Sequence, residues 1–207
     1  LLFEMLKNKF KNVRLAGVKQ KSGLEEIITM KPRDKIVVEL SSWQLEGLRR
    51  LKKSPRISVL TNILGDHLNT YKNIKEYAEA KAEIFKHQKK NDLVVFNADD
   101  KRSVDLSYKA PGGILFYSAG KKNQSGAWIN KDNFIVFGKK PVKIAGLGSI
   151  KLKGGHNLSN ILAAVTVAIY LKVPAKNILK TLERFRGLKN KLEIIGQKRG
   201  ITFINDT

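Results

Sequence analysis

Short apolar runs that end abruptly in polar residues are the main pattern of the first half of the chain. Residues 35–40 and 57–64 contain runs of this kind, and residues 93–97 form a third. Stretches in which apolar residues recur at helical spacing lie between them, at 43–51 and 73–88. This alternation of strands and amphipathic helices predicts an α/β protein with a mostly parallel sheet flanked by helices. The three runs are predicted to be buried strands of that sheet.

The remaining elements follow from the same periodicities. Before the first run, the pattern predicts a helix over 1–10, a strand over 13–16 and a helix over 24–30. Around 101–153, short apolar runs separated by Gly, Asn and Lys predict a small antiparallel β insertion. Its strands are expected at 113–118, 127–130, 134–137 and 147–152, and they are followed by helices ending near 171 and 185 and by strands at 192–195 and 201–204.

Composition narrows the class of protein. The chain has 207 residues and 42% hydrophobic residues, enough for one good core. It has no cysteine, which excludes disulfides and Cys-based zinc sites and fits a cytoplasmic location. We find no signal peptide, and no apolar run approaches the roughly 20 residues of a membrane helix, so no membrane association is expected. The chain begins at Leu1 rather than Met, and we expect it to be cut from a longer protein.

The formal net charge of +22 raises the question of a nucleic-acid partner. Most of the basic residues are lysine and they are spread along the whole chain. Specific readout of phosphates and bases leans on arginine, and no interleaving of aromatic and basic residues is present. Solvated lysine faces and an anionic substrate account for the charge better than a specific nucleic acid.

Two of the predicted strands end in groups that bind charged ligands. Glu39 ends the first run, and His67 follows the second. Because ligands bind at the carboxyl edge of open parallel sheets, these residues suggest one shared site, and together they could hold a divalent cation. Taken singly, Glu39 could instead cap the helix that begins near Ser41, and His67 could be an ordinary loop histidine.

Lys81 lies within an apolar helical stripe, four residues after Tyr77 and three before Ile84. A lysine there must reach solvent along its stem, pair with an acid, or remain partly desolvated. Desolvation lowers the pKa of a lysine, and the neutral amine is a nucleophile that can react with carbon dioxide. The simple snorkelling alternative remains open on this pattern alone.

A third candidate site lies at the start of the helix that follows two glycines, in the segment 154–160. Free backbone amides at a helix start favour anions, and Asn157 and Asn160 share one face. Asn157 could equally be the N-cap of that helix. No Gly-x-x-x-x-Gly-Lys-Ser/Thr phosphate loop occurs in the chain.

Several of these motifs occur together in one order and spacing. They are Glu39-Leu-Ser-Ser-Trp-Gln-Leu-Glu46, Thr61-Asn-Ile-Leu-Gly-Asp-His-Leu68, Ala80-Lys-Ala82, Gly155-His-Asn-Leu-Ser-Asn160, Phe185-Arg-Gly-Leu188 and Phe203-Ile-Asn-Asp206. The set resembles the ATP-binding central domain of the Mur ligases, a Rossmann-like ATPase domain. The resemblance covers nearly the whole chain, so residues 1–207 are expected to be this domain. The phosphate loop would precede Leu1, and the C-terminal ligase domain would follow Thr207.

The resemblance implies roles by position. Glu39 and His67 would be magnesium ligands, and Lys81 would be carbamylated, its new carboxylate helping to place a second magnesium. Lys81 and His67 would thus serve catalysis. Ser41, Gln44 and His67 would lie against the muramoyl substrate. Asn157, Asn160, Lys191 and Asp206 would contact the nucleotide.

The resemblance also implies a reaction. The Leu-Ser-Ser-aromatic-Gln-Leu version is similar to the member that adds D-glutamate to UDP-N-acetylmuramoyl-L-alanine with ATP and Mg²⁺, through an acyl phosphate, in peptidoglycan precursor synthesis. Another amide ligase of the same superfamily is the first alternative, and a basic nucleic-acid-binding domain is the second. A monomer is expected, and the fragment alone is expected to be inactive. Ala16-Gly17-Val18-Lys19 and Asn190-Lys191 depart from the family pattern.

Overall fold

The computed structural model describes residues 1–17, 26, 28–65, 70–122, 124–152, 154–188 and 193–205. Residues 24, 25 and 27 of the helix predicted at 24–30 lie outside these residues, and residues 26 and 28 are helical. Three predicted site residues, His67, Lys191 and Asp206, also lie outside the described residues.

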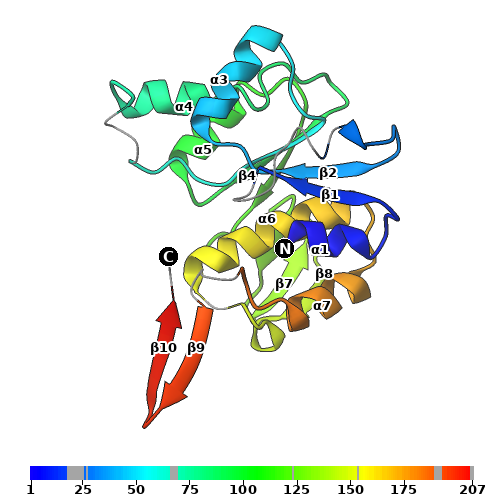
Figure 1. Ribbon diagram of the computed structural model, residues 1–207, viewed down its shortest axis with the longest axis vertical. Coiled ribbons are helices and arrows are strands. Elements are labelled where there is room, and N and C mark those ends of the chain that lie inside the picture. The colour runs from blue at the N-terminus through cyan, green and yellow to red at the C-terminus, as the bar shows by residue number, and fades with distance from the viewer. Residues whose placement is uncertain are drawn as a thin grey trace.

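Parallel strands occupy the middle of the structure, with helices on both sides (Figure 1). β1 (Val13–Ala16) pairs with β2 (Lys35–Val38). β4 (Leu93–Asn97) pairs with β3 (Ile57–Leu60) on one side and with β5 (Gly113–Tyr117) on the other. All three pairings are parallel, so the predicted α/β class with a mostly parallel sheet is confirmed.

The helices form two layers, one on each side of these strands. The first layer contains α1 (Leu2–Lys7), α6 (Gly155–Tyr170) and α7 (Ala175–Arg184), and the chain's larger apolar cluster lies beneath it. The second layer contains α4 (Ile74–Ala82) and α5 (Lys101–Ser107), with α3 (Ser42–Leu51) packed against α4. Figure 1 shows α3, α4 and α5 above the strands and α1, α6 and α7 below them.

β4 shows why the chain forms two cores. All five of its residues are buried, and successive side chains of a strand point to opposite faces. Leu93 and Val95 join the cluster under α6, while Val94 and Phe96 join the cluster under α4 and α5. A continuous apolar run is therefore required at this central position.

A small antiparallel sheet extends from the edge of β5. It consists of β6 (Ala127–Ile129), β7 (Phe134–Phe137) and β8 (Val142–Gly146), and a short 3₁₀ helix, η1 (Leu147–Ser149), follows it. The Gly126 amide donates to the Phe116 carbonyl at 2.8 Å and links the two sheets. The predicted antiparallel insertion is thus present in the second half of its predicted span.

Several predicted elements in this region were wrong in detail. Residues 101–107 form helix α5 rather than part of the insertion, and β5 pairs in parallel with β4. The last antiparallel strand is β8 rather than 147–152, where η1 begins. Whether two apolar runs pair in parallel depends on distant segments, so their local pattern does not reveal it.

Three predicted elements of the first half also differ from the structure. Helix α4 ends at Ala82 instead of near residue 88, and β3 ends at Leu60 instead of Leu64. β2 was predicted as a buried strand, but Val38 is 44% exposed. Among the described strands β2 pairs only with β1, whereas β4 has a neighbour on each side.

The chain ends in the hairpin of β9 (Glu193–Lys198) and β10 (Ile201–Asn205), which confirms the last two predicted strands. Figure 1 shows it projecting from the rest of the molecule. Its apolar side chains at 195, 201, 203 and 204 are exposed.

Candidate functional site

The segment that follows β3 is held by the neighbouring strand and helix. The Asn62 carboxamide oxygen accepts a hydrogen bond from the Asn97 side chain at 2.9 Å. The Ile63 amide donates to the Asp100 carboxylate at 2.7 Å, and Asp100 also caps helix α5. This segment leads toward His67, which lies outside the described residues, so its proximity to Glu39 stays a prediction.

Glu39 directly follows β2, as predicted. Its backbone amide donates to the Ala16 carbonyl at 3.1 Å, which continues the pairing with β1, and its side chain is exposed. The alternative role as a helix cap is wrong, because the N-cap of α3 is Ser41. An exposed carboxylate at the carboxyl end of a parallel strand is suited to bind a cation.

Gly17 lies against the backbone of Glu39. Its φ is +79°, and a Cβ at this position would lie 2.0 Å from the Glu39 carbonyl oxygen. Only glycine allows this backbone conformation together with this contact. The end of β1 therefore fixes the position from which the Glu39 side chain projects.

We expect Gly17→Ala to destabilise the protein, by about 1–2 kcal/mol from the left-handed conformation alone, with the clash adding to this. The matched control is Gly47→Ala on α3, where a new Cβ meets nothing within 4 Å. That change should stabilise the protein by about 0.5–1 kcal/mol, because alanine favours a helix interior. Urea unfolding measures both free energies. Equal effects of the two substitutions would contradict the constraint at Gly17.

Ser41 and Gln44 form a capping box at the start of α3. The Ser41 hydroxyl accepts from the Gln44 amide at 3.3 Å, and the Gln44 side-chain oxygen accepts from the Ser41 amide at 2.8 Å. This box explains both residue types through helix stability alone. Both residues are exposed, and their predicted contact with a substrate stays a prediction.

Lys81 lies on α4 with its side chain half-buried. Its Nζ lies 4.9 Å from the ring centroid of Tyr77, which is buried and packs at 5.2 Å from the ring of Tyr71. The face of an aromatic ring attracts a cation. The Lys81 amine therefore lies against the Tyr77 ring instead of extending freely into water.

A buried carboxylate, Glu83, lies just beyond the end of α4, and the sequence analysis missed it. Glu83 is fully buried, and its Oε1 accepts from Arg49 Nε and from Lys86 Nζ, each at 3.0 Å. His87 Nε2 lies 3.6 Å from the other carboxylate oxygen. Burial opposes ionisation, but hydrogen bonds and charges from Lys86 and Arg49 outweigh it and hold the pKa of Glu83 below its usual value.

These contacts join the C-terminal ends of α3 and α4, because Arg49 belongs to the last turn of α3. The helical periodicity used to predict α4 through residue 88 could not reveal Glu83. The chain leaves α-helical geometry at Ala82, so helical spacing no longer tells which side chains point inward. The only available signal was an acidic residue among apolar neighbours.

The start of α6 presents the predicted nucleotide residues. The N-cap is Gly154, with φ +104° and no side-chain cap hydrogen bond, so the N-cap alternative for Asn157 is wrong. Asn157 lies in the first turn and is half-buried, and Asn160 is exposed. Backbone amides at the start of such a helix favour an anionic ligand.

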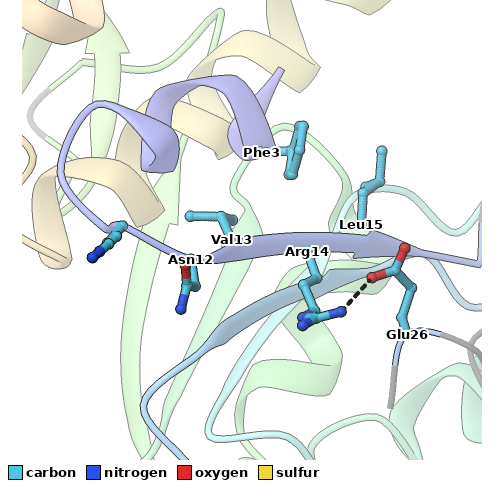
Figure 2. Close-up of a pocket in the computed structure, with 7 residues that line it drawn as sticks. Phe3, Asn12, Val13, Arg14, Leu15 and Glu26 are labelled. Atoms are coloured by element: carbon cyan, nitrogen blue, oxygen red, sulfur yellow. Dashed lines mark hydrogen bonds and ion pairs between the residues drawn. The ribbon is translucent and has the colours of Figure 1, made fainter. Parts of the chain in front are cut away.

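A cavity of about 290 Å³ lies beside β1 and is lined by none of the predicted site residues (Figure 2). Phe3, Val13 and Leu15 form part of its wall. The Arg14 guanidinium donates hydrogen bonds to the Glu26 carboxylate at 3.3 Å and to the Thr29 hydroxyl at 2.6 Å. The guanidinium of Arg14 thus has a structural role at this cavity.

Two kinds of feature are absent from the described part of the chain. These residues contain no group of three or more His, Asp or Glu side chains that could hold a metal ion. Within the same ranges, no helix has the length and apolar character needed to span a membrane.

The comparison with protein families gives a match that covers most of the chain. The Mur ligase middle domain matches residues 2–168. The chain therefore belongs to the Mur ligase family. It is 40% identical over all 207 residues to the UDP-N-acetylmuramoylalanine–D-glutamate ligase of Bacillus cereus strain AH187, and 39% identical to the ligase of the same name from Bacillus thuringiensis. The chain covers 45% of each of these relatives, so it spans less than half of their length.

Solved structures of the family share the fold. MurF from Acinetobacter baumannii aligns with a TM-score of 0.72 and 19% identity, covering 100% of this chain and 48% of that protein. MurF ligase from Thermotoga maritima, solved in complex with ADP, aligns with a TM-score of 0.70 and 21% identity, covering 100% of this chain and 50% of that protein. These likenesses support the arrangement of layers described above.

Proposed function

We propose that this chain is the nucleotide-binding middle domain of an ATP-dependent amide ligase that adds D-glutamate to UDP-N-acetylmuramoyl-L-alanine. The observation that carries the proposal is the 40% identity, over the entire chain, to a ligase named for that reaction. In the proposed reaction the γ-phosphoryl group of ATP moves to the substrate carboxylate and ADP leaves. The amine of D-glutamate then attacks the acyl phosphate, phosphate leaves, and the amide forms with loss of a proton.

Positions of the predicted residues support this assignment. Asn157 and Asn160 lie at the start of α6, where the nucleotide would bind, and Lys191 and Asp206 are proposed as further nucleotide contacts. Mg²⁺ fits the exposed carboxylate of Glu39, because magnesium prefers oxygen ligands. His67 is the proposed second ligand. When bound, magnesium would shield the negative charges that approach one another during phosphoryl transfer.

Lys81 is proposed to act as a carbamate. Its neutral amine would add to the carbon of carbon dioxide and lose a proton, which replaces a cation by a carboxylate. The half-buried side chain holds the amine beside the Tyr77 ring, which supports the proposal by limiting the positions that its carboxylate would occupy. Ser41 and Gln44, at the start of the neighbouring helix α3, are proposed to contact the muramoyl substrate.

The remaining assignments are also proposals. Because the chain spans less than half of its relatives, we infer that a phosphate loop and an amino-acid-binding domain are supplied by other parts of a longer protein. The exposed apolar side chains of the β9–β10 hairpin are consistent with packing against such a part. A cytoplasmic location, a monomeric state and the absence of a specific nucleic-acid partner stay predictions.

The test is an assay of the full-length protein with ATP, Mg²⁺ and UDP-N-acetylmuramoyl-L-alanine. We expect ADP and phosphate release, with formation of the amide, on addition of D-glutamate. L-Glutamate is the matched control and should support at least about 100-fold less product, because a positioned reaction is sensitive to misplacement of the reacting group. Amide formation with a different amino acid would instead favour another ligase of the superfamily.

A further inference from the structure

Tyr117, at the end of β5, connects two parts of the molecule that carry predicted site residues. Its side chain is fully buried. Its hydroxyl donates to the Thr61 carbonyl at 3.1 Å and accepts from the Ser159 hydroxyl at 3.4 Å. One phenol oxygen thus links the end of β3 to Ser159, at the beginning of the second turn of α6.

The α6 end of this link lies at the proposed nucleotide site. Ser159 lies between Asn157 and Asn160 in the sequence, in a helix that begins at Gly155 without a side-chain cap. Helices α3 and α4 each begin with a side-chain cap, from Ser41 and Asn73 respectively, whereas α6 has no such cap hydrogen bond. The hydrogen bond from Ser159 to Tyr117 is therefore a contact that fixes α6 near its start.

The β3 end of the link is held by hydrogen bonds from neighbouring elements. Thr61 is followed by Asn62 and Ile63, which are held by Asn97 at 2.9 Å and by Asp100 at 2.7 Å. The hydrogen bond from Tyr117 to Thr61 therefore connects the N-terminal part of α6 to a segment that is itself hydrogen-bonded to the sheet and to the cap of α5.

We propose that Tyr117 is a positioning residue for the nucleotide, which holds the N-terminal part of α6 in register with the end of β3. The inference rests on the proposed function, since it takes the start of α6 as the nucleotide site. A shift of about 1 Å in a positioning element is enough to lower activity strongly. Burial raises the pKa of Tyr117 to about 12, so its hydroxyl remains a hydrogen-bond donor at neutral pH.

The test uses the full-length protein with Tyr117→Phe, which keeps the ring and removes the hydroxyl. We expect the Kd for ADP, measured by calorimetry, to rise about 5- to 20-fold, the range for loss of one or two hydrogen bonds at a buried position. The KM for ATP should rise with it, while the KM for the UDP-linked substrate stays within about 2-fold. A purely structural role would not separate the two KM values in this way.

Ser159→Ala is the second variant, and it removes the other partner of the same contact. It should weaken ADP binding by a similar factor, and the double variant should be less than additive, because both changes break one linkage. Ser159 is half-buried, so this variant keeps the inference testable if Tyr117→Phe does not fold. Tyr108→Phe is the matched control, because Tyr108 is 87% exposed, and it should leave the Kd unchanged.

The outcomes separate the two proposals. If wild-type protein binds ADP and both single variants bind equally well, Tyr117 has no positioning role and only this inference is overturned. If wild-type protein does not bind ADP, the proposed function is overturned and this inference with it. Loss of stability in Tyr117→Phe with unchanged ADP binding would assign the residue to the core alone.

Discussion

Replacing Lys81 by alanine in the full-length protein is expected to lower the rate of amide formation by about 100- to 1000-fold, the effect of losing one electrostatic group that stabilises a transition state. The reason is the proposed carbamate, whose carboxylate would be lost with the amine. The fold should be retained, because the side chain is only half-buried and lies on the surface of the Tyr77 ring. Steady-state rates, together with circular dichroism of the variant, measure both effects.

Lys75→Ala is the matched control, because Lys75 is an exposed lysine of the same helix. It should leave the rate within about 2-fold, as is usual for surface substitutions. A small carboxylic acid added in solution should partly restore Lys81→Ala, since it can occupy the place of the carbamate. Full activity of Lys81→Ala with bicarbonate excluded would show that Lys81 is an ordinary surface lysine.

The double variant Arg49→Ala, Lys86→Ala is expected to lower the free energy of unfolding by about 3 kcal/mol, at the lower end of values for breaking a buried ion pair. It leaves the Glu83 carboxylate buried without the two cations that hydrogen-bond to it. The lower end is appropriate because the Arg49 and Lys86 side chains are themselves more than half exposed. Urea unfolding at neutral pH measures the loss.

Arg50→Ala, Lys53→Ala is the control, because it removes the same charge from exposed positions beside Arg49. It should change stability by no more than about 0.5 kcal/mol. An equal loss in both double variants would mean that net charge, rather than the Glu83 contacts, accounts for the result.

The Glu83 contacts also predict how stability depends on pH. The pKa of Glu83 in the folded protein lies below its ordinary value of 4.5, so its contribution is fully present above that pH. The contribution is lost as the pH falls through the folded pKa. The Arg49→Ala, Lys86→Ala variant should lose the fall in stability that the Glu83 contacts cause on acidification. Unfolding curves between neutral and acidic pH measure this difference.

The fold was predictable where local pattern and tertiary environment agree. β4 and α6 are almost entirely apolar over their buried lengths, and their existence follows from the sequence. Helix α5 was missed because its seven residues include only Val104 and Leu106 as large apolar groups. Its stability comes from the Asp100 cap and from packing of Leu106 against the second core, and neither contact is visible in a short window.

The candidate site was predictable in part, for a related reason. Residues that mark strand and helix ends, such as Glu39 and Asn157, stand out because polar groups interrupt apolar runs. Tyr117 and Glu83 do not stand out, since an aromatic residue in a strand and an acid after a helix are both common. Their importance depends on partners such as Ser159 and Arg49, which lie far away in the sequence.

The mixed sheet arrangement also sets an order of events in folding. In the antiparallel sheet, Ala127 pairs with Phe137 across a short connection, whereas in the parallel sheet Ile57 pairs with Leu93 and an entire helix lies between them. Closing a longer loop costs more chain entropy, and pairings between distant segments form more slowly. Strands β6 to β8 should therefore assemble first, together with the helix α6 that packs on them. The edge of β5 would then join a preformed unit, and the parallel strands β3 and β4, which are far apart in the sequence, would be among the last to pair.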